Sequence, residues 1–415
     1  MQIELKYGKG ILEFELDPNN WTGTLFPSTY ETVGDESSII KSSLQNPINS
    51  GRLGEVVNQG ETVAIITSDI SRPMPSYKVL PHVLSELYES GIKPEDITIV
   101  LALGSHRGHT DDEKAHLVGR DVFESEVTVI DSDMNDCVNL GICKNGTPVD
   151  VFRPVVNSDR IICLGNIEYH YFAGYSGGAK AIMPGVSSHE AIQANHRNMV
   201  HVDAVAANLV TNPVRQDIDQ VPEFIDIDFI VNVVLNAKKE VIGAFSGHWK
   251  TAHRKGCDFL DGIYGIKIDG PSDIVIVSPG GFPKDLNLYQ AHKGLDNAKH
   301  AVKDGGTIIF CASAKEGFGE HVFEKWMLTM TASQRVAEIK RNFKLGGHKA
   351  AAIGLVQEKV EIIMVTDLEK EIVQKIGFTY CSSIDEAIEI AQINQGRHAK
   401  ILVMPAAGST LPIIR

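Results

Sequence analysis

Four short segments of the 415-residue chain hold most of the side chains that could do chemistry. Each lies at or just after an apolar run that predicts a buried strand. Together they contain imidazoles suited to general acid–base catalysis, a lysine amine among glycines, and cations able to bind a carboxylate. The segments are residues 68–73 (SDISRP), 104–110 (GSHRGHT), 165–185 (GNIEYHYFAGYSGGAKAIMPG) and 278–294 (SPGGFPKDLNLYQAHKG).

His106 and His170 are candidate general acids or bases, because each follows a predicted strand and an unperturbed imidazole titrates near working pH. His109 is a third imidazole, in the same segment as His106. Taken singly, a histidine in such a place is more often a hydrogen-bonded loop residue. The residues alone therefore leave the roles of all three open.

The run GYSGGAK, from Gly174 to Lys180, comes close to a phosphate-binding P-loop without matching it. That motif requires G-x-x-x-x-G-K-[ST], but Ala179 replaces the last glycine and Ala181 replaces the hydroxyl residue. Glycines beside a single lysine instead favour close approach to a planar or phosphorylated group, with Lys180 as a point charge or an amine nucleophile. A turn that carries an ordinary surface lysine is the alternative.

Two cations stand where they could bind an anionic substrate. Arg72 lies in SRP and Lys293 lies in QAHKG. A guanidinium can bind a carboxylate through two hydrogen bonds, whereas an ammonium acts as a point charge. The alternative for both side chains is an ordinary ion pair.

A helix is predicted after the glycine-rich segment. Ser187 followed by Glu190 is a capping box and predicts the start of that helix. His189 and His196 are seven residues apart and would lie on nearly the same face, so either could point back at the glycine-rich loop. Incidental histidines on a solvated helix are the alternative.

Several familiar sites are missing from the sequence. His248 and His253 are five residues apart, which suits zinc chelation on a helix badly, and the six cysteines contain no C-x-x-C pair. No G-x-G-x-x-G opens a helix after a strand, and G-x-S-x-G is absent. Structural zinc, a freely exchanging dinucleotide and a serine hydrolase therefore lack support.

The elements that must position these residues form an α/β pattern. A strand at 61–69, a helix at 76–90 and a strand at 96–106 make a β-α-β unit. Further strands are expected at 127–133, 160–166 and 229–236, and, after a hinge near 268–273, at 273–281, 306–313, 360–367 and 399–408. This alternation predicts two Rossmann-like α/β domains with mostly parallel sheets.

The expected boundaries place residues 1–270 in an N-terminal domain that carries the candidate histidines and Lys180. Residues 271–404 are expected to form a C-terminal domain, and residues 405–415 to pack back on the first domain. Ligands of such folds collect beyond the carboxyl ends of the strands. We therefore expect the active site in the cleft between the two domains.

Composition narrows the class of protein and of partner. Hydrophobic residues make up 43% and charged residues 22%, which is typical of a globular protein. The 39 Lys and Arg against 53 Asp and Glu leave a net charge of −14, so a basic surface for nucleic acid or anionic membrane is not expected. Scattered cysteines and the lack of a signal peptide or long apolar run predict a cytoplasmic protein.

Taken together, SDISRP, GSHRGHT, IEYHYFAGYSGGAKAIMPG, NHRNM and LNLYQAHKGL resemble the nickel-dependent lactate racemase family, over residues from about 60 to 410. The resemblance implies a nickel pincer nucleotide, pyridinium-3,5-bisthiocarboxylic acid mononucleotide, joined to Lys180 through a thioamide. Asp69, Gly177 and Gly178 would help bind it. Two sulfurs and one carbon of the cofactor would hold nickel, with His196 as the fourth ligand, a square-planar geometry that nickel accepts.

The same resemblance assigns roles around a 2-hydroxy acid. His106 and His170 would stand on opposite sides of it, each able to take the hydroxyl proton while the C2 hydride passes to the cofactor. A planar 2-keto acid would then receive the hydride on its other face. The residues implied to bind substrate are Arg72, Tyr289, Gln290 and Lys293.

The predicted function is thus racemisation or epimerisation of lactate or a related 2-hydroxy acid. Family members differ in substrate among lactate, larger aliphatic hydroxy acids, malate and sugar acids, and this chain has no tryptophan after Trp326. The expected partners are a small-molecule substrate and the proteins that make the cofactor, with neither nucleic acid nor membrane. Two alternatives remain, an NAD-dependent hydroxy acid dehydrogenase and a non-catalytic nucleotide- or metal-binding protein.

Overall fold

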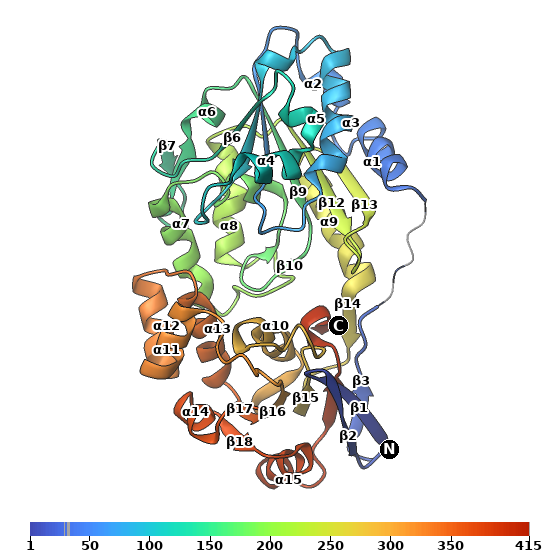
Figure 1. Cartoon of the computed structure of the whole chain (residues 1–415), viewed down its shortest axis with the longest axis vertical. Coiled ribbons are helices and arrows are strands. Elements are labelled where there is room, and N and C mark those ends of the chain that lie inside the picture. The colour runs from blue at the N-terminus through green and yellow to red at the C-terminus, as the bar shows by residue number, and fades with distance from the viewer. Residues whose placement is uncertain (29, 31–33, 415) are drawn as a thin grey trace. The chain divides into compact units, whose positions relative to one another are not determined.

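A computed structural model describes residues 1–28, 30 and 34–414, and Figure 1 shows the helices and strands along the chain. The chain forms two compact units. We call Tyr30–Leu260 the central unit, and Asp261–Arg415 together with Met1–Thr29 the terminal unit, because the second contains both ends of the chain. The mixed α/β architecture with two mostly parallel sheets confirms the predicted fold class.

The central unit is built on a six-stranded sheet with the order β13-β12-β9-β4-β5-β6. All neighbours pair in parallel except β12 and β13, which are antiparallel at one edge. The strands are β4 (Val63–Ser68), β5 (Ile97–Ala102), β6 (Thr128–Asp131), β9 (Arg160–Asn166), β12 (Phe229–Leu235) and β13 (Val241–Gly247). Continuous apolar runs form the inner strands because both faces of the sheet are covered.

Helices and short strands surround this sheet. The helices are α1 (Glu36–Gln45), α2 (Leu53–Val56), α3 (Ser76–Glu89), α4 (Asp111–Val118), α5 (Arg120–Phe123), α6 (Arg153–Val156), α7 (His189–His196), α8 (Pro213–Gln220) and α9 (Trp249–Tyr264). Short pairs are β7 (Cys137–Ile142) with β8 (Pro148–Phe152) and β10 (Tyr169–His170) with β11 (Gly174–Tyr175). A 3₁₀ turn, η2, spans Gly178–Ala181.

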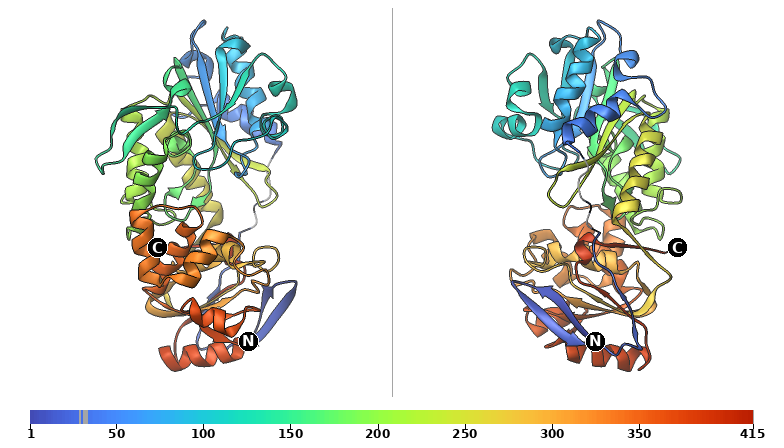
Figure 2. Two further views of the ribbon diagram at one scale, coloured as in Figure 1. Left: turned by 60° about the vertical axis from the view of Figure 1, so that its left-hand side comes forward. Right: turned by 90° about the vertical axis from the view of Figure 1, so that its right-hand side faces the viewer.

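The core of the central unit lies between the sheet and α1, α2 and α3. Helix α3 buries Val79, Val83 and Leu87 at helical spacing, against strand residues that include Ile65 and Ile99. Figure 2 shows α9, in yellow, on the opposite side of the sheet. Burial on both faces makes the sheet a rigid base for the loops at its carboxyl edge.

The strand order reverses beside β4. The chain runs from β4 to β5 and β6 on one side, and then returns to place β9 and β12 on the other side. In an open α/β sheet the loops after the two strands that flank such a reversal diverge and leave room for a ligand. The loops after β4 and β9 carry two of the chemically active segments, and the loop after β5 carries a third.

The terminal unit has a second six-stranded sheet, with the order β18-β17-β16-β15-β19-β3 and all neighbours parallel. Its strands are β3 (Trp21–Thr24), β15 (Ser272–Val277), β16 (Val302–Cys311), β17 (Glu361–Val365), β18 (Thr379–Cys381) and β19 (Ile401–Met404). Its helices are α10 (Leu288–Ala298), α11 (His321–Thr329), α12 (Ala332–Arg341), α13 (Gly347–Gln357), α14 (Lys370–Lys375) and α15 (Ile384–Gln395).

The boundaries of the units depart from the expected ranges at both ends of the chain. The hairpin β1 (Gln2–Tyr7) with β2 (Gly10–Glu15) and the edge strand β3 belong to the terminal unit, not to the same unit as residues 30–260. The hairpin buries Leu5 and Phe14 in the core of that unit and lies beside α15 (Figure 2). Strand β20 (Leu411–Ile414) pairs with β14 (Gly265–Ile268), again within the terminal unit. Pairing between distant strands, which no local pattern encodes, decides these placements.

No described helix combines the length and apolar character needed to cross a membrane.

Candidate active site

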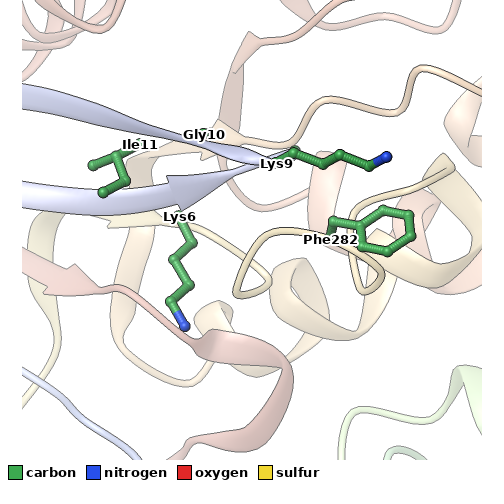
Figure 3. Close-up of a pocket in the computed structure, with 6 residues that line it drawn as sticks. Lys6, Lys9, Gly10, Ile11 and Phe282 are labelled. Atoms are coloured by element: carbon green, nitrogen blue, oxygen red, sulfur yellow. The ribbon is translucent and has the colours of Figure 1, made fainter.

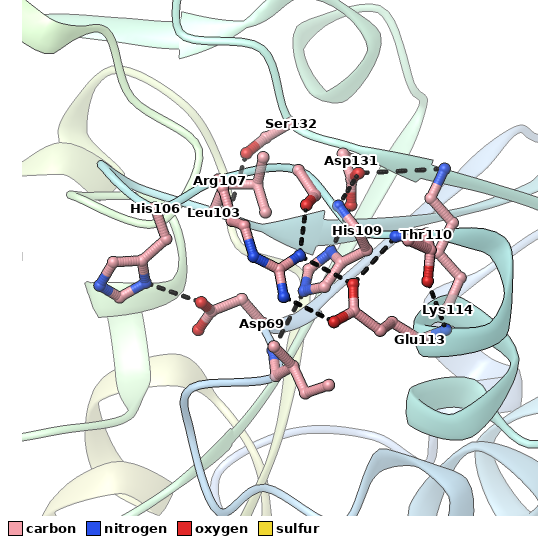
Figure 4. Close-up of polar contacts among 12 residues, drawn as sticks. Asp69, Leu103, His106, Arg107, His109, Thr110, Glu113, Lys114, Asp131 and Ser132 are labelled. Carbon is pink, nitrogen blue, oxygen red and sulfur yellow. Dashed lines mark hydrogen bonds and ion pairs between the residues drawn. The ribbon is translucent and has the colours of Figure 1, made fainter.

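Strands β4 and β5 are neighbours, so the residues that follow them meet at the carboxyl edge of the sheet. His106 Nδ1 lies 2.7 Å from Asp69 Oδ2 (Figure 4). A carboxylate only accepts, so the ring donates its Nδ1 proton and presents a lone pair on Nε2. A neutral imidazole oriented in this way by a buried carboxylate is a general base.

Asp69 is 3% exposed. Burial by itself raises the pKa of its carboxyl group, but hydrogen bonds from His106 and Ser71 and the charge of Arg72 outweigh that effect and lower the pKa below its usual value. The Ser71 hydroxyl donates to Asp69 Oδ1 over 2.9 Å. The carboxylate therefore stays ionised at neutral pH and can stabilise an imidazolium at His106.

His109 has a structural role. Its Nδ1 donates to Asp131 Oδ1 over 2.6 Å, and its Nε2 accepts the backbone N–H of Ile70 over 3.1 Å (Figure 4). Both ring nitrogens are used, and 1% of the side chain is exposed. His109 thus holds the loop that carries Asp69, and the ordinary interpretation of a loop histidine applies to it.

The glycine-rich segment packs so closely against neighbouring residues that two of its positions leave no space for a side chain. Gly177 and Gly178 have φ angles of +79° and +61°. The N–H of Gly178 donates to Asn232 Oδ1 over 2.8 Å, and a Cβ atom on Gly178 would lie 2.9 Å from Cγ of His253. Both the backbone conformation and the packing therefore require glycine here, and the turn η2 presents Lys180 next to it.

Lys180 is partly exposed but surrounded by protein atoms and cations. Burial lowers its pKa most, and the charges of Arg72 and Arg215 lower it further, to about 7. A far larger share of the amines is then unprotonated at pH 7 than in an ordinary lysine, for which that share is roughly one in several thousand. An unprotonated amine is a nucleophile, so Lys180 differs from a solvated surface lysine.

His170 lies in strand β10, and its Nδ1 accepts a hydrogen bond, whereas Nδ1 of His106 donates one. Its Nδ1 accepts the backbone N–H of Ala173 over 3.2 Å, which places the proton of the neutral ring on Nε2. Burial, followed by the charges of Lys180 and Arg72, holds the pKa of His170 well below its usual value. His170 is therefore neutral at pH 7 and presents a donor, where His106 presents an acceptor.

His196 ends helix α7 and is 8% exposed. Its Nδ1 lies 3.2 Å from Asn195 Oδ1, and the Asn195 amide donates to Val214 O. His196 therefore donates from Nδ1, which places the lone pair on Nε2, the state of a metal-binding imidazole held by an outer partner. The ring packs edge-on against Phe172, with centroids 5.0 Å apart.

The start of α7 differs from the expected capping box. Ser188, not Ser187, caps the helix and accepts the N–H of Ala191, whereas Ser187 donates to Ile182 O. His189 is exposed near the start of the helix, with Nε2 2.8 Å from the Gln193 amide nitrogen. The structure thus distinguishes a buried His196 from a solvated His189. In the described part of the chain, no group of three or more His, Cys, Asp or Glu residues is placed to hold a metal.

The structure brings most of the predicted site residues together in the central unit. Lys180, Arg72 and His196 each lower the pKa of His170, so these three side chains lie within electrostatic reach of it. Asp69 lies near the same residues, because its charge acts on Lys180. Gly177 and Gly178 also lie there, since they cap and begin the turn η2 that contains Lys180. The spacing of these residues along the chain did not reveal this cluster.

Tyr289, Gln290 and Lys293 lie at the start of α10, in the terminal unit. Lys349 holds the tyrosine, because its Nζ lies 3.6 Å from the ring centroid and donates to the carbonyl oxygen of Tyr289 over 2.9 Å. Lys293 is exposed. It remains available to an anion.

A cavity of about 360 Å³ lies elsewhere in the terminal unit, at the turn of the β1–β2 hairpin (Figure 3). It is lined by Lys6, Gly8, Lys9, Gly10, Ile11 and Phe282, and Lys9 Nζ lies 5.2 Å from the centroid of the Phe282 ring. None of the predicted site residues lines this cavity.

The sequence analysis did not identify three residues that support the glycine-rich loop. Asn232, on β12, accepts from Gly178; Arg215, on α8, and His253, on α9, donate to carbonyl oxygens of the loop. His253 was considered only as a partner of His248. No local signal marks these residues, because their partners lie far away in the sequence.

Comparison with known proteins agrees with this arrangement. The lactate racemase N-terminal domain matches residues 7–207, and the lactate racemase C-terminal domain matches residues 268–411. The chain belongs to the lactate racemase family. It is therefore an isomerase of the racemase type.

Two curated members of the family align over nearly the whole chain. A lactate racemase from Thermoanaerobacterium thermosaccharolyticum is 33% identical, with 99% of this chain and 98% of that protein covered. A lactate racemase from Lactiplantibacillus plantarum is 32% identical, with 97% of each chain covered.

Solved structures show the same fold. The lactate racemase apoprotein from Thermoanaerobacterium thermosaccharolyticum has a TM-score of 0.86 at 32% identity and covers 100% of both chains. A protein from Thermotoga maritima, 20% identical, has a TM-score of 0.63 over 93% of this racemase and 100% of its own chain, and shares the fold.

Asp69→Asn tests the pairing that orients His106. The amide can donate to Nδ1 and so favours the wrong tautomer, and it cannot stabilise an imidazolium. We expect kcat for racemisation to fall roughly 10²- to 10⁴-fold, with a smaller change in KM. Ser71→Ala removes the hydroxyl that contacts Asp69 Oδ1 and His106 Nδ1 but keeps the carboxylate, so this control should cost much less. A kcat for Asp69→Asn within a few fold of the wild type would remove Asp69 from this role.

Proposed function

We propose that this racemase interconverts the enantiomers of lactate or a closely related 2-hydroxy acid, with a nickel pincer nucleotide attached to Lys180. The observation that carries the proposal is a pair of histidines, His106 and His170, in complementary hydrogen-bonding states near a lysine with a lowered pKa. Lactate as substrate is supported by two relatives named lactate racemase.

The residues of the central unit fit the proposed cofactor. The amine of Lys180 has a lowered pKa, and Gly177 and Gly178 pack against Asn232 and His253, which fixes the turn that presents this amine. Within the described residues, Nδ2 of the buried Asn232 has no hydrogen-bond partner beside this loop. Lys180 would carry the cofactor through a thioamide, and Nε2 of His196 would be the protein's ligand to nickel.

The bound cofactor would supply reversible uptake of the hydride at C2 of the substrate, since no protein side chain can accept a hydride. The protein's own residues handle charge and protons. Arg72 would bind the substrate carboxylate with charge-assisted hydrogen bonds. Nε2 of His106 would take the hydroxyl proton of one enantiomer, with Asp69 stabilising the resulting imidazolium.

His170 would handle the hydroxyl proton of the other enantiomer. In the structure its Nε2 carries the proton, because Nδ1 accepts from Ala173. Acting as a base requires that proton to move to Nδ1, at the loss of the Ala173 contact, whereas His106 already presents a lone pair. The low pKa of His170 makes its imidazolium a strong acid, so it would release the proton readily to substrate oxygen.

Residues of α10 would complete substrate binding. Lys293 would provide a second positive charge for the carboxylate, and Tyr289 and Gln290 would contact the rest of the substrate. The support is that Lys349 holds Tyr289 in place while Lys293 stays exposed. We further propose a cytoplasmic location, where the six free cysteines stay reduced, and the enzymes that make the cofactor as partners.

Racemisation separates the proposal from its alternatives. Protein from a host that makes the cofactor should contain nickel, carry added mass at Lys180, and abolish the optical rotation of lactate without net oxidation. Lys180→Arg should lose both the added mass and the activity. Accumulation of keto acid with NADH would instead indicate a dehydrogenase, and cofactor or metal bound without turnover would indicate a binding protein. Active protein with unmodified Lys180 would disprove the attachment.

The second test concerns the nickel ligand. His196→Ala should lose nickel or bind it at least tenfold more weakly, because a first-row metal depends strongly on each remaining protein ligand. His189→Ala is the matched control on the same helix, and it should retain nickel because its side chain is solvated. The measurement is metal content after dialysis. Equal nickel retention in the two variants would remove His196 from the site.

The third test separates the two histidines. His106→Ala and His170→Ala should each lose full racemisation by roughly 10²-fold or more. In a single turnover each variant should still convert one enantiomer to the 2-keto acid, and the two variants should prefer opposite enantiomers. Rapid quenching and assay of the keto acid measure this. Comparable yields from both enantiomers in either variant would contradict the assignment of one histidine per enantiomer.

A further inference from the structure

The loop between His170 and Lys180 is clamped along its backbone. Five consecutive carbonyl oxygens, from Phe172 to Ser176, each accept a hydrogen bond from another part of the central unit. The donors are Asn212 Nδ2 to Phe172 (2.9 Å), Arg215 Nε to Ala173 (3.1 Å), Ala207 N to Gly174 (3.1 Å), Arg215 Nη2 to Tyr175, and His253 Nε2 to Ser176 (2.7 Å). One arginine supplies two of these five contacts.

Arg215 is a charged group in a fully buried place, with 0% of its surface exposed. Its Nη1 lies 3.6 Å from Asp219 Oδ1, while the other oxygen of Asp219 pairs with Arg254. One carboxylate thus serves two guanidinium groups, which leaves an excess positive charge beside the loop. A buried charge that is only partly balanced is costly. A neutral side chain could fill the same space, so the charge itself needs an explanation.

Four charged groups from three segments act on Lys180. Arg72, after β4, and Arg215, on α8, favour the unprotonated amine. Glu168, after β9, and Asp69, after β4, oppose them. Arg72 is exposed and is assigned to substrate, so its position can change when substrate binds. Arg215 is fixed by its two carbonyl contacts and supplies a constant charge.

We propose that Arg215 is a positioning residue for the attachment lysine: it clamps the carbonyl oxygens of Ala173 and Tyr175 and sets a fixed positive charge beside the loop, so that Lys180 presents an unprotonated amine to the cofactor. The inference rests on the proposed attachment at Lys180. It gives a reason for a buried arginine to which the proposed function assigns neither substrate nor metal. Its two parts, the hydrogen-bonding fork and the charge, can be separated by substitution, because lysine lacks the planar fork while the neighbouring Asp219 carboxylate favours its charged form.

The test follows the amine of Lys180 in full-length protein made without the cofactor. An amine-reactive reagent such as cyanate labels only the unprotonated form, and peptide mass spectrometry gives the rate at Lys180 as a function of pH. In the wild type the rate should reach half of its maximum near pH 7. In Arg215→Met the half-maximal pH should move upward, so that labelling at pH 7 falls roughly threefold or more.

Two further variants complete the design. Arg215→Lys should keep the half-maximal pH close to that of the wild type but lower kcat of the loaded enzyme, because the fork is lost. Arg153→Met is the control for a general change in net charge, since Arg153 is exposed and pairs with Asp136. It should leave the labelling profile unchanged. The proposal is overturned if Arg215→Met keeps the wild-type profile, or if Arg215→Lys shifts it as much as Arg215→Met.

If Arg215→Met does not fold, Asp219→Asn also tests whether charge at this position controls the protonation of Lys180, and the expected shift of the half-maximal pH has the opposite direction. Removing the shared carboxylate leaves more positive charge, so the half-maximal pH should move downward; an unchanged profile would overturn the proposal. The readout needs no cofactor. A shifted profile in the apoprotein together with a loaded enzyme that lacks mass on Lys180 would therefore reject the attachment while leaving the effect of Arg215 intact.

Discussion

The parallel pairing of β4 with both β5 and β9 is the constraint on which the site depends. It places the carboxyl ends of three strands side by side, so that Asp69, His106 and the segment leading to Lys180 start from neighbouring points. Packing on both faces keeps these starting points rigid. Short loops from a rigid edge can then hold side chains at hydrogen-bonding distance, which catalysis by positioned groups requires.

Charge distribution gives similar side chains different states. Asp69 is ionised although buried, because His106, Ser71 and Arg72 favour its charged form. Lys180 has a lowered pKa, because burial and neighbouring cations disfavour its charged form. The two imidazoles differ by partner, since one donates to a carboxylate and the other accepts from a backbone N–H. A racemase that serves two mirror-image substrates needs groups with such distinct states.

Much of the fold could be predicted from the sequence because its strands are continuous apolar runs. The strands at 160–166 and 229–236 appear almost as expected, and the glycines at 177 and 178 sit where only glycine fits. The antiparallel edge strand β13 and the placement of residues 1–28 were not predicted. Strand β13 pairs with β12, which directly precedes it in the chain, whereas β3 pairs with β19, which is far away in the sequence, and local periodicity holds no information about that distant pairing.

The sequence by itself determined the α/β architecture, the chemical types at the site and, through its long central motif, the family. Apolar periodicity, glycine positions and motif spacing are local properties, so they can be recognised in the amino-acid sequence alone. The tertiary structure shows that His109 pairs through both ring nitrogens, with Asp131 and with the backbone N–H of Ile70, and so supports a loop. It also places His196 in a buried position and His189 in a solvated one, and it brings Arg215 to the carbonyl oxygens that precede Lys180. Burial, tautomer and amine protonation depend on atoms brought together from distant parts of the chain, because desolvation and Coulomb energies act through space.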